Sequence, residues 1–492
     1  MPALALLRPP FGPRRRRSRR LRGPLALAAS APAAALALLV ALVAATALAP
    51  AARADERGAA RALARHRDDP ARLHGFLRAM PKGADLHMHL SGAVYAETLL
   101  RFGAEGGACA DLTTLVASAG PCAEGERPLA DALGDNGFQT RLLNAWSMKS
   151  FPPGMPGHDH FFATFGKFGA ALDGRVGEGL ATIIRRARSQ NVQYLELLLT
   201  PRGWETAELA RRVGFTRDFA ALRRRLLDAG LRELLPRARA DLDAITRQKR
   251  RHDPAGDPLV RFDVQVSRAV EPARAFAQLL LGFELMADDP RWVGVNLVQP
   301  EDDVVALRDY RLQMRMIRYL RSVYRDGHVT LHAGELAPGL VPPADLRFHV
   351  RAAVDVAGAE RIGHGVDIRW ERDPVGLARR MARRGVLVEV PLTSNRQILG
   401  VSGRRHPLRF YLRHGVPVAL ATDDEAVSRT NLTEQYEQAV RDHGLGYRAL
   451  KRIATDALRH AFVEPAVKRR LLRDQRRRFQ RFEARYPAPA ER

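Results

Sequence analysis

The run Gly83-Ala84-Asp85-Leu86-His87-Met88-His89 alternates apolar with polar side chains. Successive side chains of a β-strand point to opposite faces, so the run predicts a strand with both histidines on one face. Further β-branched or leucine-rich runs follow, separated by longer stretches rich in arginine, alanine and leucine. The eight predicted strands are 83–89, 192–198, 260–266, 292–297, 329–333, 361–364, 386–390 and 418–422. Eight alternating units predict a closed (β/α)8 TIM barrel of the α/β class.

Two segments lie outside this repeating pattern. Residues 55–80 are predicted as an N-terminal helical segment, with one helix over 57–80. The gap between the first two predicted strands is far longer than one crossover helix needs, so 102–151 is predicted as an insertion within a barrel domain spanning 81–485.

The first 54 residues are predicted to be a targeting signal and not part of the fold. Arginines cluster at 14–22, an uncharged apolar run covers 25–49, and Ala52-Arg53-Ala54 has the pattern of a cleavage site. The apolar run is also long enough to span a bilayer as an uncleaved anchor, so membrane attachment is expected only if it is retained. In both cases the folded part is expected to be exported, to the periplasm or the medium.

The chain contains two cysteines, Cys109 and Cys122, in a segment that also carries several glycines. An oxidising compartment favours a disulfide between them, and the alternative is two free thiols. A catalytic thiol is not expected, because no histidine lies nearby in the sequence.

The formal charge of +25 is unevenly spread. Residues 1–54 carry arginines and no acidic residue, and many other arginines lie in 468–485. The interleaved Asp474, Phe479 and Glu483 favour a solvated amphipathic helix there over a nucleic-acid surface, so no specific nucleic-acid partner is expected. No glycine-rich phosphate fingerprint follows a predicted strand, which argues against a nucleotide cofactor.

Histidines or carboxylates end four of the predicted strands, where a barrel places its active site. Besides the two histidines of 83–89, these are the motifs Leu331-His332-Ala333-Gly334-Glu335, Arg361-Ile362-Gly363-His364-Gly365 and Thr422-Asp423-Asp424. Three neutral imidazoles and one carboxylate suit a single Zn²⁺ ion per chain, with a position left for water. Zinc lowers the pKa of bound water and so supplies a hydroxide nucleophile.

Attack on an aromatic carbon that bears an amine also requires an acid to protonate the ring nitrogen. Glu335 lies three residues beyond His332, and a carboxyl in a dry site can stay protonated. His364 can orient or deprotonate the water.

The sequence Met-Pro-Lys-Gly-Ala-Asp-Leu-His-Met-His-Leu-Ser-Gly-Ala at 80–93 resembles the opening motif of the adenosine deaminase family. The stretches 332–335 and 361–365 resemble its His-Ala-Gly-Glu and Arg-Ile-Gly-His-Gly signatures, and Thr393-Ser394-Asn395 and Thr422-Asp423-Asp424 resemble its late motifs. The resemblance covers the chain from Pro81 to the C-terminal helices.

This resemblance implies a role for each matching residue. The implied zinc ligands are His87, His89, His332 and Asp423. Glu335 is implied as the proton donor to purine N1, and His364 as the residue that positions the zinc-bound hydroxide. Asp424 would contact the five-membered ring of the base, and the backbone N–H of Gly294 would contact the purine.

The sequence departs from the family pattern at three positions. Ser91 stands where relatives usually carry an aspartate that helps to hold the ribose, so it is the residue expected at the sugar. Asn296 stands where many relatives have aspartate, and Pro391 lies close to a frequent cysteine. None of the three is an implied metal ligand.

The implied reaction is zinc-dependent hydrolytic deamination of adenosine or deoxyadenosine to inosine or deoxyinosine and ammonia. Export and the cysteine-bearing insertion resemble the secreted, growth-factor-like branch of the family. Alternatives are a deaminase of adenine or of a modified nucleoside, a secreted binding protein without activity, and a nucleic-acid-binding protein. Whether 102–151 and 201–257 form a homodimer surface or a lid stays open.

Overall fold

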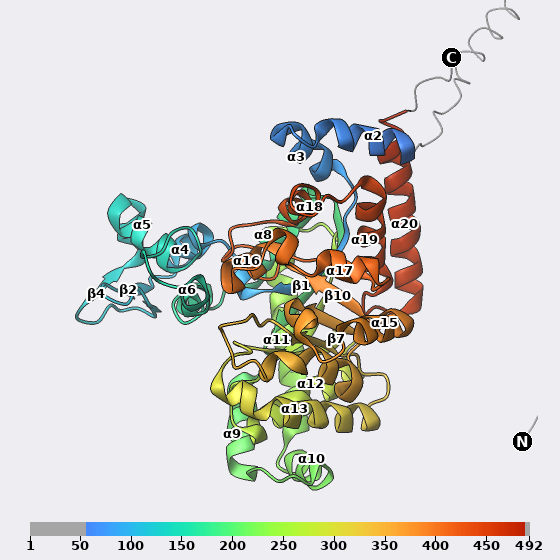
Figure 1. Cartoon of the computed structure of the whole chain (residues 1–492). Coiled ribbons are helices and arrows are strands. Elements are labelled where there is room, and N and C mark those ends of the chain that lie inside the picture. Colours follow the sequence, from blue (N-terminus) through green and yellow to red (C-terminus); the bar gives the residue numbers. More distant parts are fainter. Residues whose placement is uncertain (1–55, 488–492) are drawn as a thin grey trace, which may run out of the picture. The chain divides into compact units, whose positions relative to one another are not determined.

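The computed structural model describes residues 56–487 (Figure 1). The predicted leader, 1–54, lies outside the described residues. Within 56–487, no helix is both long and apolar enough to cross a membrane.

Eight parallel strands form the centre of the fold. They are β1 (Gly83–His89), β5 (Val192–Leu199), β6 (Leu259–Ser267), β7 (Trp292–Val298), β8 (Thr330–Ala333), β9 (Arg361–His364), β10 (Leu387–Val390) and β11 (Val418–Leu420). One hydrogen-bonded group has the order β1-β5-β6-β7, and the other has the order β8-β9-β10-β11. The eight strands predicted from the sequence are therefore confirmed, and β1 and β9 have the predicted bounds.

Isolated parallel bridges connect the two groups of strands at both of their edges. Met88 of β1 pairs with Asp423, just beyond β11, and the N–H of His89 donates to the carbonyl of Asp423 at 3.0 Å. Val295 of β7 pairs with Val329, just before β8. The strands are thus linked around a ring, and the fold is the predicted (β/α)8 TIM barrel.

Helices that alternate with the strands cover this ring. They include α8 (Val176–Ser189), α11 (Leu234–His252), α12 (Pro272–Asp288), α13 (Val304–Val323), α15 (Pro374–Arg384), α17 (Leu408–Arg413) and α19 (Tyr447–Arg459). The helix α12 shows why the sequence folds this way. Its alanines, leucines and phenylalanines are buried around most of its circumference, because it packs against β6, β7 and α13.

The C-terminal helix α20 (Pro465–Glu483) is amphipathic, as predicted. Leu471, Phe479 and Phe482 are buried, whereas Arg469 and Arg476 are exposed.

The N-terminal segment contains two helices, α2 (Glu56–His66) and α3 (Pro70–Ala79), so the prediction of one helix over 57–80 is wrong. The break lies at Asp69 and Pro70. The side chain of Asp69 caps α3 by accepting the N–H of Arg72 at 3.0 Å. Pro70 occupies the first turn of α3, where its missing N–H costs nothing, but it could not continue α2.

Between β1 and α8 the chain forms an added unit. It comprises α4 (Ala96–Glu105), the antiparallel strands β2 (Cys109–Asp111), β3 (Ala117–Ser118) and β4 (Glu126–Pro128), and the helices α5 (Asn136–Ala145), α6 (Gly157–Thr164) and α7 (Gly169–Leu172). These elements extend beyond the predicted insertion, 102–151, at both ends. The helix α6 returns to the barrel, where it packs against α16 (Leu392–Leu399).

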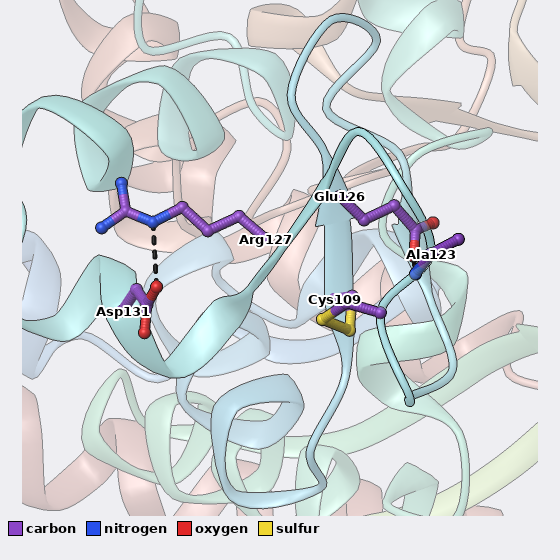
Figure 2. The surroundings of a disulfide bond; sticks show 6 residues. Cys109, Ala123, Glu126, Arg127 and Asp131 are labelled. Carbon is purple, nitrogen blue, oxygen red and sulfur yellow. Dashed lines mark hydrogen bonds and ion pairs between the residues drawn. A yellow bond between two sulfur atoms is a disulfide. The ribbon is translucent and has the colours of Figure 1, made fainter.

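A disulfide joins Cys109 of β2 to Cys122, with their Cα atoms 5.4 Å apart (Figure 2). The predicted pairing is confirmed. Beside it, Arg127 Nε forms an ion pair of 2.9 Å with Asp131 (Figure 2). The bond ties together the irregular segment between the short strands of the added unit, which bury few apolar residues of their own.

Loss of this disulfide should loosen the added unit and leave the barrel folded. Closing a loop of about 15 residues contributes roughly 3 kcal/mol in the chain-entropy account. We expect limited proteolysis of a Cys109→Ser/Cys122→Ser variant to cut near the former bond faster than in the wild type, with the far-ultraviolet circular dichroism unchanged. Two titratable thiols in the unreduced wild type, or equal cleavage rates, would contradict this assignment.

Candidate metal centre and active site

The four predicted zinc ligands converge at the carboxyl ends of the barrel strands. His87 and His89 share one face of β1, His332 lies in β8, and Asp423 follows β11. Asp423 adopts a left-handed conformation with φ of 60°. Its N–H donates to the carbonyl of His87 at 2.9 Å, so backbone pairing with β1 holds this unusual turn beside the two histidines.

Their ligand atoms form a closed ring of short distances. His332 Nε2 lies 3.0 Å from His87 Nε2 and 3.3 Å from His89 Nε2. Asp423 Oδ1 lies 3.4 Å from His87 Nε2 and 3.3 Å from His89 Nε2. Ligands about 2.0–2.1 Å from a tetrahedral zinc ion are themselves roughly 3.3 Å apart. The observed spacing therefore fits one zinc ion held by all four residues.

Two of the histidines are oriented by buried oxygen acceptors. His87 Nδ1 lies 2.7 Å from Glu389 Oε2, and His332 Nδ1 lies 2.8 Å from Asn296 Oδ1. Because these oxygens only accept, Nδ1 carries the proton in each ring, and the Nε2 lone pair faces the shared centre. Asn296, one of the departures from the family pattern, still provides the oxygen that this geometry needs.

The other two ligands are oriented in the same way. His89 Nδ1 lies 2.8 Å from Gln265 Oε1, and the hydroxyl of Ser394 donates to Asp423 Oδ2 at 2.6 Å. Asp423 Oδ1 is buried and has no hydrogen-bond partner among the described residues. An unpaired buried carboxylate oxygen facing imidazole lone pairs is the arrangement expected of a metal site.

The carboxylate of Glu389 belongs to a buried charge network below the histidines. It accepts from Thr330 Oγ1 at 3.0 Å and pairs with Arg361 Nε at 2.6 Å, and Arg361 also pairs with Glu196 at 2.6 Å. Burial alone would raise the pKa of Glu389, but Arg361 and His87 outweigh burial and lower it. Glu389 therefore stays ionised as an acceptor for His87.

The backbone holds Glu335 beside the metal ligands. The N–H groups of Gly334 and Glu335 donate to the carboxylate of Glu301 at 3.0 and 2.8 Å. Gly334 has φ of +76°, and a Cβ there would lie 2.3 Å from Asp367 Oδ1, so only glycine fits this turn. Burial raises the pKa of Glu335 well above its usual value, and nearby Asp423 adds to the rise. Burial therefore favours the protonated carboxyl, which can act as a proton donor.

Glu301, which anchors this turn, is itself a buried anion. Burial would raise its pKa, but the charge and hydrogen bond of His349 and the charge of Arg268 outweigh burial and lower the pKa to about 2. Arg268 also donates to the carbonyl of His332 at 2.6 Å. The same cluster thus positions both a metal ligand and the candidate acid.

His364 lies at the end of β9, next to this group. Its ligand atom and those of His87, His332 and Asp423 all lie within 4.8 Å of one another. His364 Nε2 is buried without a hydrogen-bond partner among the described residues, and its Nδ1 lies 3.4 Å from Glu335 Oε1. Burial lowers the pKa of His364 to about 4, so the ring is neutral.

Asp424 lies beside two of the predicted metal ligands, His89 and Asp423. Its ligand atom lies within 4.8 Å of those of His89 and Asp423. Burial raises the pKa of Asp424 to about 7, although the charge of His89 opposes the rise. A Cβ at Gly92 would lie 1.7 Å from Asp424 Oδ1, so this glycine gives the carboxyl its space.

These residues line a cavity of about 540 Å³, a size typical of small-molecule sites. The lining includes the predicted residues His89, Ser91, His332, Glu335, Asp423 and Asp424. It also includes four phenylalanines, here called the aromatic wall: Phe161, Phe162, Phe165 and Phe168. Among the described residues, no lysine or arginine lines the cavity.

Gly294 does not line the cavity, which corrects the expected contact between its N–H and the purine. It lies in the first half of β7, where a Cβ would meet Asp263 Oδ1 at 2.3 Å. The strand continues for four more residues, to Val298 at its carboxyl end, which is a distance of roughly 13 Å. Gly294 therefore gives space to a buried carboxylate inside the barrel, far below its open end.

The sequence analysis missed several residues of the cavity. Gln265 lies at the end of β6 and Gln299 directly follows β7, so strand ends alone could have indicated them. Gln299 has a left-handed φ of 82°, which is uncommon for a residue other than glycine. Strand ends do not indicate the aromatic wall, because its phenylalanines lie in or next to the short helices α6 and α7.

Comparisons with known proteins agree with these motifs. Residues 293–476 match the family model described as adenosine deaminase. The chain is 36% identical to an adenosine deaminase of Edwardsiella ictaluri over 148 residues, which covers 30% of the chain and 41% of that protein. It is 31% identical to one of Clostridium perfringens over 166 residues, which covers 34% and 45%. The matches therefore span less than half of these relatives.

Solved structures share the fold at low sequence identity. An N6-mAMP deaminase of Arabidopsis is 20% identical, with a TM-score of 0.52, over 82% of this chain and 99% of that one. An amidohydrolase of Burkholderia ambifaria, solved with bound Zn, is 20% identical, with a TM-score of 0.53, over 85% and 95%. The family model, the curated relatives and the motifs at the strand ends agree in a similarity to adenosine deaminases, and the stretch matched by the family model is less than half of this chain.

Proposed function

We propose that this protein is a zinc-dependent hydrolase that converts adenosine or deoxyadenosine to inosine or deoxyinosine and ammonia. The observation that carries the proposal is the convergence of three imidazole nitrogens and Asp423 Oδ1 beside Glu335, whose pKa is raised by burial. A bound zinc ion would lower the pKa of a water toward neutrality and so supply hydroxide.

The side chains of the site account for the remaining requirements of the reaction. Attack at C6 of the base places electron density on N1, and Glu335 can donate its proton there. His364 can position the attacking oxygen, and Asp424 can bind the five-membered ring. The oxygen of water stays on C6, and the amino group leaves as ammonia.

The charge of the cavity favours a nucleoside over a nucleotide. Proteins bind phosphate through arginine, lysine or helix N-termini, and no described lysine or arginine lines this cavity. One structural relative from Arabidopsis was solved with IMP. Because no described lysine or arginine of this chain lines the cavity to bind a phosphate, adenosine is favoured over AMP.

The aromatic wall supports a second candidate substrate. Four phenylalanines in contact with the cavity can bind an apolar substituent through burial of its surface. An aminopurine nucleoside with an apolar group is therefore the alternative, and Ser91 in place of the usual aspartate leaves room for a different sugar contact.

Export to the periplasm or the medium is part of the proposal. The disulfide between Cys109 and Cys122 supports it, because such bonds persist in oxidising compartments.

Replacing Glu335 by glutamine should remove the proton donor and leave the metal site intact. We expect kcat to fall by about 10²- to 10⁴-fold, the usual contribution of a general acid, with zinc content unchanged. The matched control is Glu360→Gln. Glu360 lies just before β9, at the end of the strand opposite to His364, so this variant should keep full turnover. Wild-type turnover in Glu335→Gln would contradict the assigned role.

The preferred substrate tests whether the cavity, which no described lysine or arginine lines, favours an uncharged nucleoside. In a panel of adenosine, deoxyadenosine, AMP, adenine and N6-methyladenosine, we expect kcat/KM to be at least tenfold higher for an uncharged nucleoside than for AMP. A preference for AMP would overturn the inference from the cavity, and a preference for adenine would assign the site to free bases.

The pH dependence of kcat/KM reports on Glu335. Only the protonated form donates, and burial raises its pKa above the usual 4.5. Activity should therefore persist as the pH rises through 4.5 and should decline only at a higher pH, where Glu335 loses its proton. A tenfold fall in kcat/KM for each pH unit above 4.5 would show an ordinary carboxyl.

A further inference from the structure

A chain of buried hydrogen bonds leads away from His364, on the side opposite its free nitrogen. His364 Nδ1 lies 2.8 Å from the amide oxygen position of Asn395, and the amide nitrogen position of Asn395 lies 2.9 Å from His406 Nε2. The backbone N–H of Leu408 donates to His406 Nδ1 at 3.1 Å. The three side chains of this relay are at most 1% exposed.

The hydrogen bond between Leu408 and His406, at the end of the relay far from His364, has a fixed direction. Leu408 is the first residue of α17, so its N–H has no acceptor within the helix. A backbone amide only donates, and His406 Nδ1 must therefore accept. Burial lowers the pKa of His406 to about 3, so the ring is neutral and its single proton lies on Nε2.

The proton on His406 Nε2 determines the orientation of the Asn395 amide. It needs an acceptor, so the amide oxygen of Asn395 must face His406 and the amide NH₂ must face His364. The two ends of an asparagine amide are distinguished by such a network. The reverse orientation would point donors at both nitrogens of His406, which a neutral imidazole cannot accept.

The NH₂ group of Asn395 then donates to His364 Nδ1. A ring nitrogen that accepts a hydrogen bond carries no proton, so the proton of the His364 ring must lie on Nε2. We infer that His406, acting through Asn395, holds His364 with Nε2–H directed into the active site, so that His364 donates a hydrogen bond to the attacking oxygen and does not act as its base. This catalytic role rests on the proposed function, whereas the tautomer rests on the hydrogen bonds alone.

The inference distinguishes His364 from the three metal-binding histidines. The Nδ1 atoms of His87, His89 and His332 face oxygen acceptors, which leaves their Nε2 lone pairs free. His364 Nδ1 faces a donor, so its Nε2 carries a proton and cannot ligate. This difference gives a reason why a fourth imidazole, whose ligand atom lies within 4.8 Å of those of His87, His332 and Asp423, would not bind the metal.

Glu335 is the one neighbour that could oppose this tautomer. Its Oε1 lies 3.4 Å from His364 Nδ1, and an ionised carboxylate there would favour a proton on Nδ1. This contact is longer than the 2.8 Å between His364 Nδ1 and Asn395, and burial raises the pKa of Glu335, which favours its neutral carboxyl.

Nitrogen NMR of the full protein, labelled with ¹⁵N in its histidine rings, tests the tautomer directly. Spectra of the zinc-loaded and the metal-free protein are assigned with His364→Gln and His406→Gln. We expect both residues to give the signature of a neutral ring protonated at Nε2. A His364 ring protonated at Nδ1, or an imidazolium at either residue, would overturn the inference, whether or not the protein deaminates adenosine.

Two variants connect the tautomer to function. In Asn395→Asp, the carboxylate can only accept, so His364 should shift to the Nδ1–H form, with zinc content unchanged and kcat reduced by about 10²-fold or more, as for a lost preorganised donor. In His406→Gln, the amide can still donate to Asn395, so the tautomer and kcat should be largely retained. Full activity of Asn395→Asp with a shifted tautomer would refute the donor role.

Discussion

The hydrogen bond between His87 Nδ1 and the buried carboxylate of Glu389 links the active site to the interior of the barrel. Glu389 is ionised because Arg361 lies against it, and Arg361 is in turn neutralised by Glu196. Breaking a buried charge network of this kind commonly costs 3–5 kcal/mol, since one charge is left uncompensated. The orientation of a metal ligand is therefore tied to the stability of the fold.

The chemistry of the site depends on where each proton resides. Acceptor oxygens keep the imidazoles of the proposed metal site protonated at Nδ1, as His332 with Asn296 illustrates. Burial favours the neutral form of Glu335, although Asp423 remains charged close by. In the inferred hydrogen-bond network, His364 differs from the proposed ligands because its Nδ1 faces a donor. Neighbouring groups of similar type would thus take the separate roles of ligand, acid and hydrogen-bond donor.

The sequence predicted the barrel well, because each strand is a short apolar run and the chemical motifs sit at strand ends. The predicted contact of Gly294 with the purine was wrong because the sequence places a residue on a strand but does not show how far along the barrel axis it lies. The break at Pro70 was missed because the apolar spacing continues across it. Phe161 and Phe165 reach the cavity only because the added unit folds back onto the barrel, a tertiary contact that sequence periodicity does not show.

We propose that four side chains from β1, β8 and the end of β11 bind one zinc ion. Elemental analysis by mass spectrometry of the purified full chain is the direct test. We predict one zinc per chain in the wild type and almost none in His332→Ala and Asp423→Ala, with circular dichroism showing that both variants are folded. A wild type that binds no zinc, or variants that retain it fully, would contradict the account.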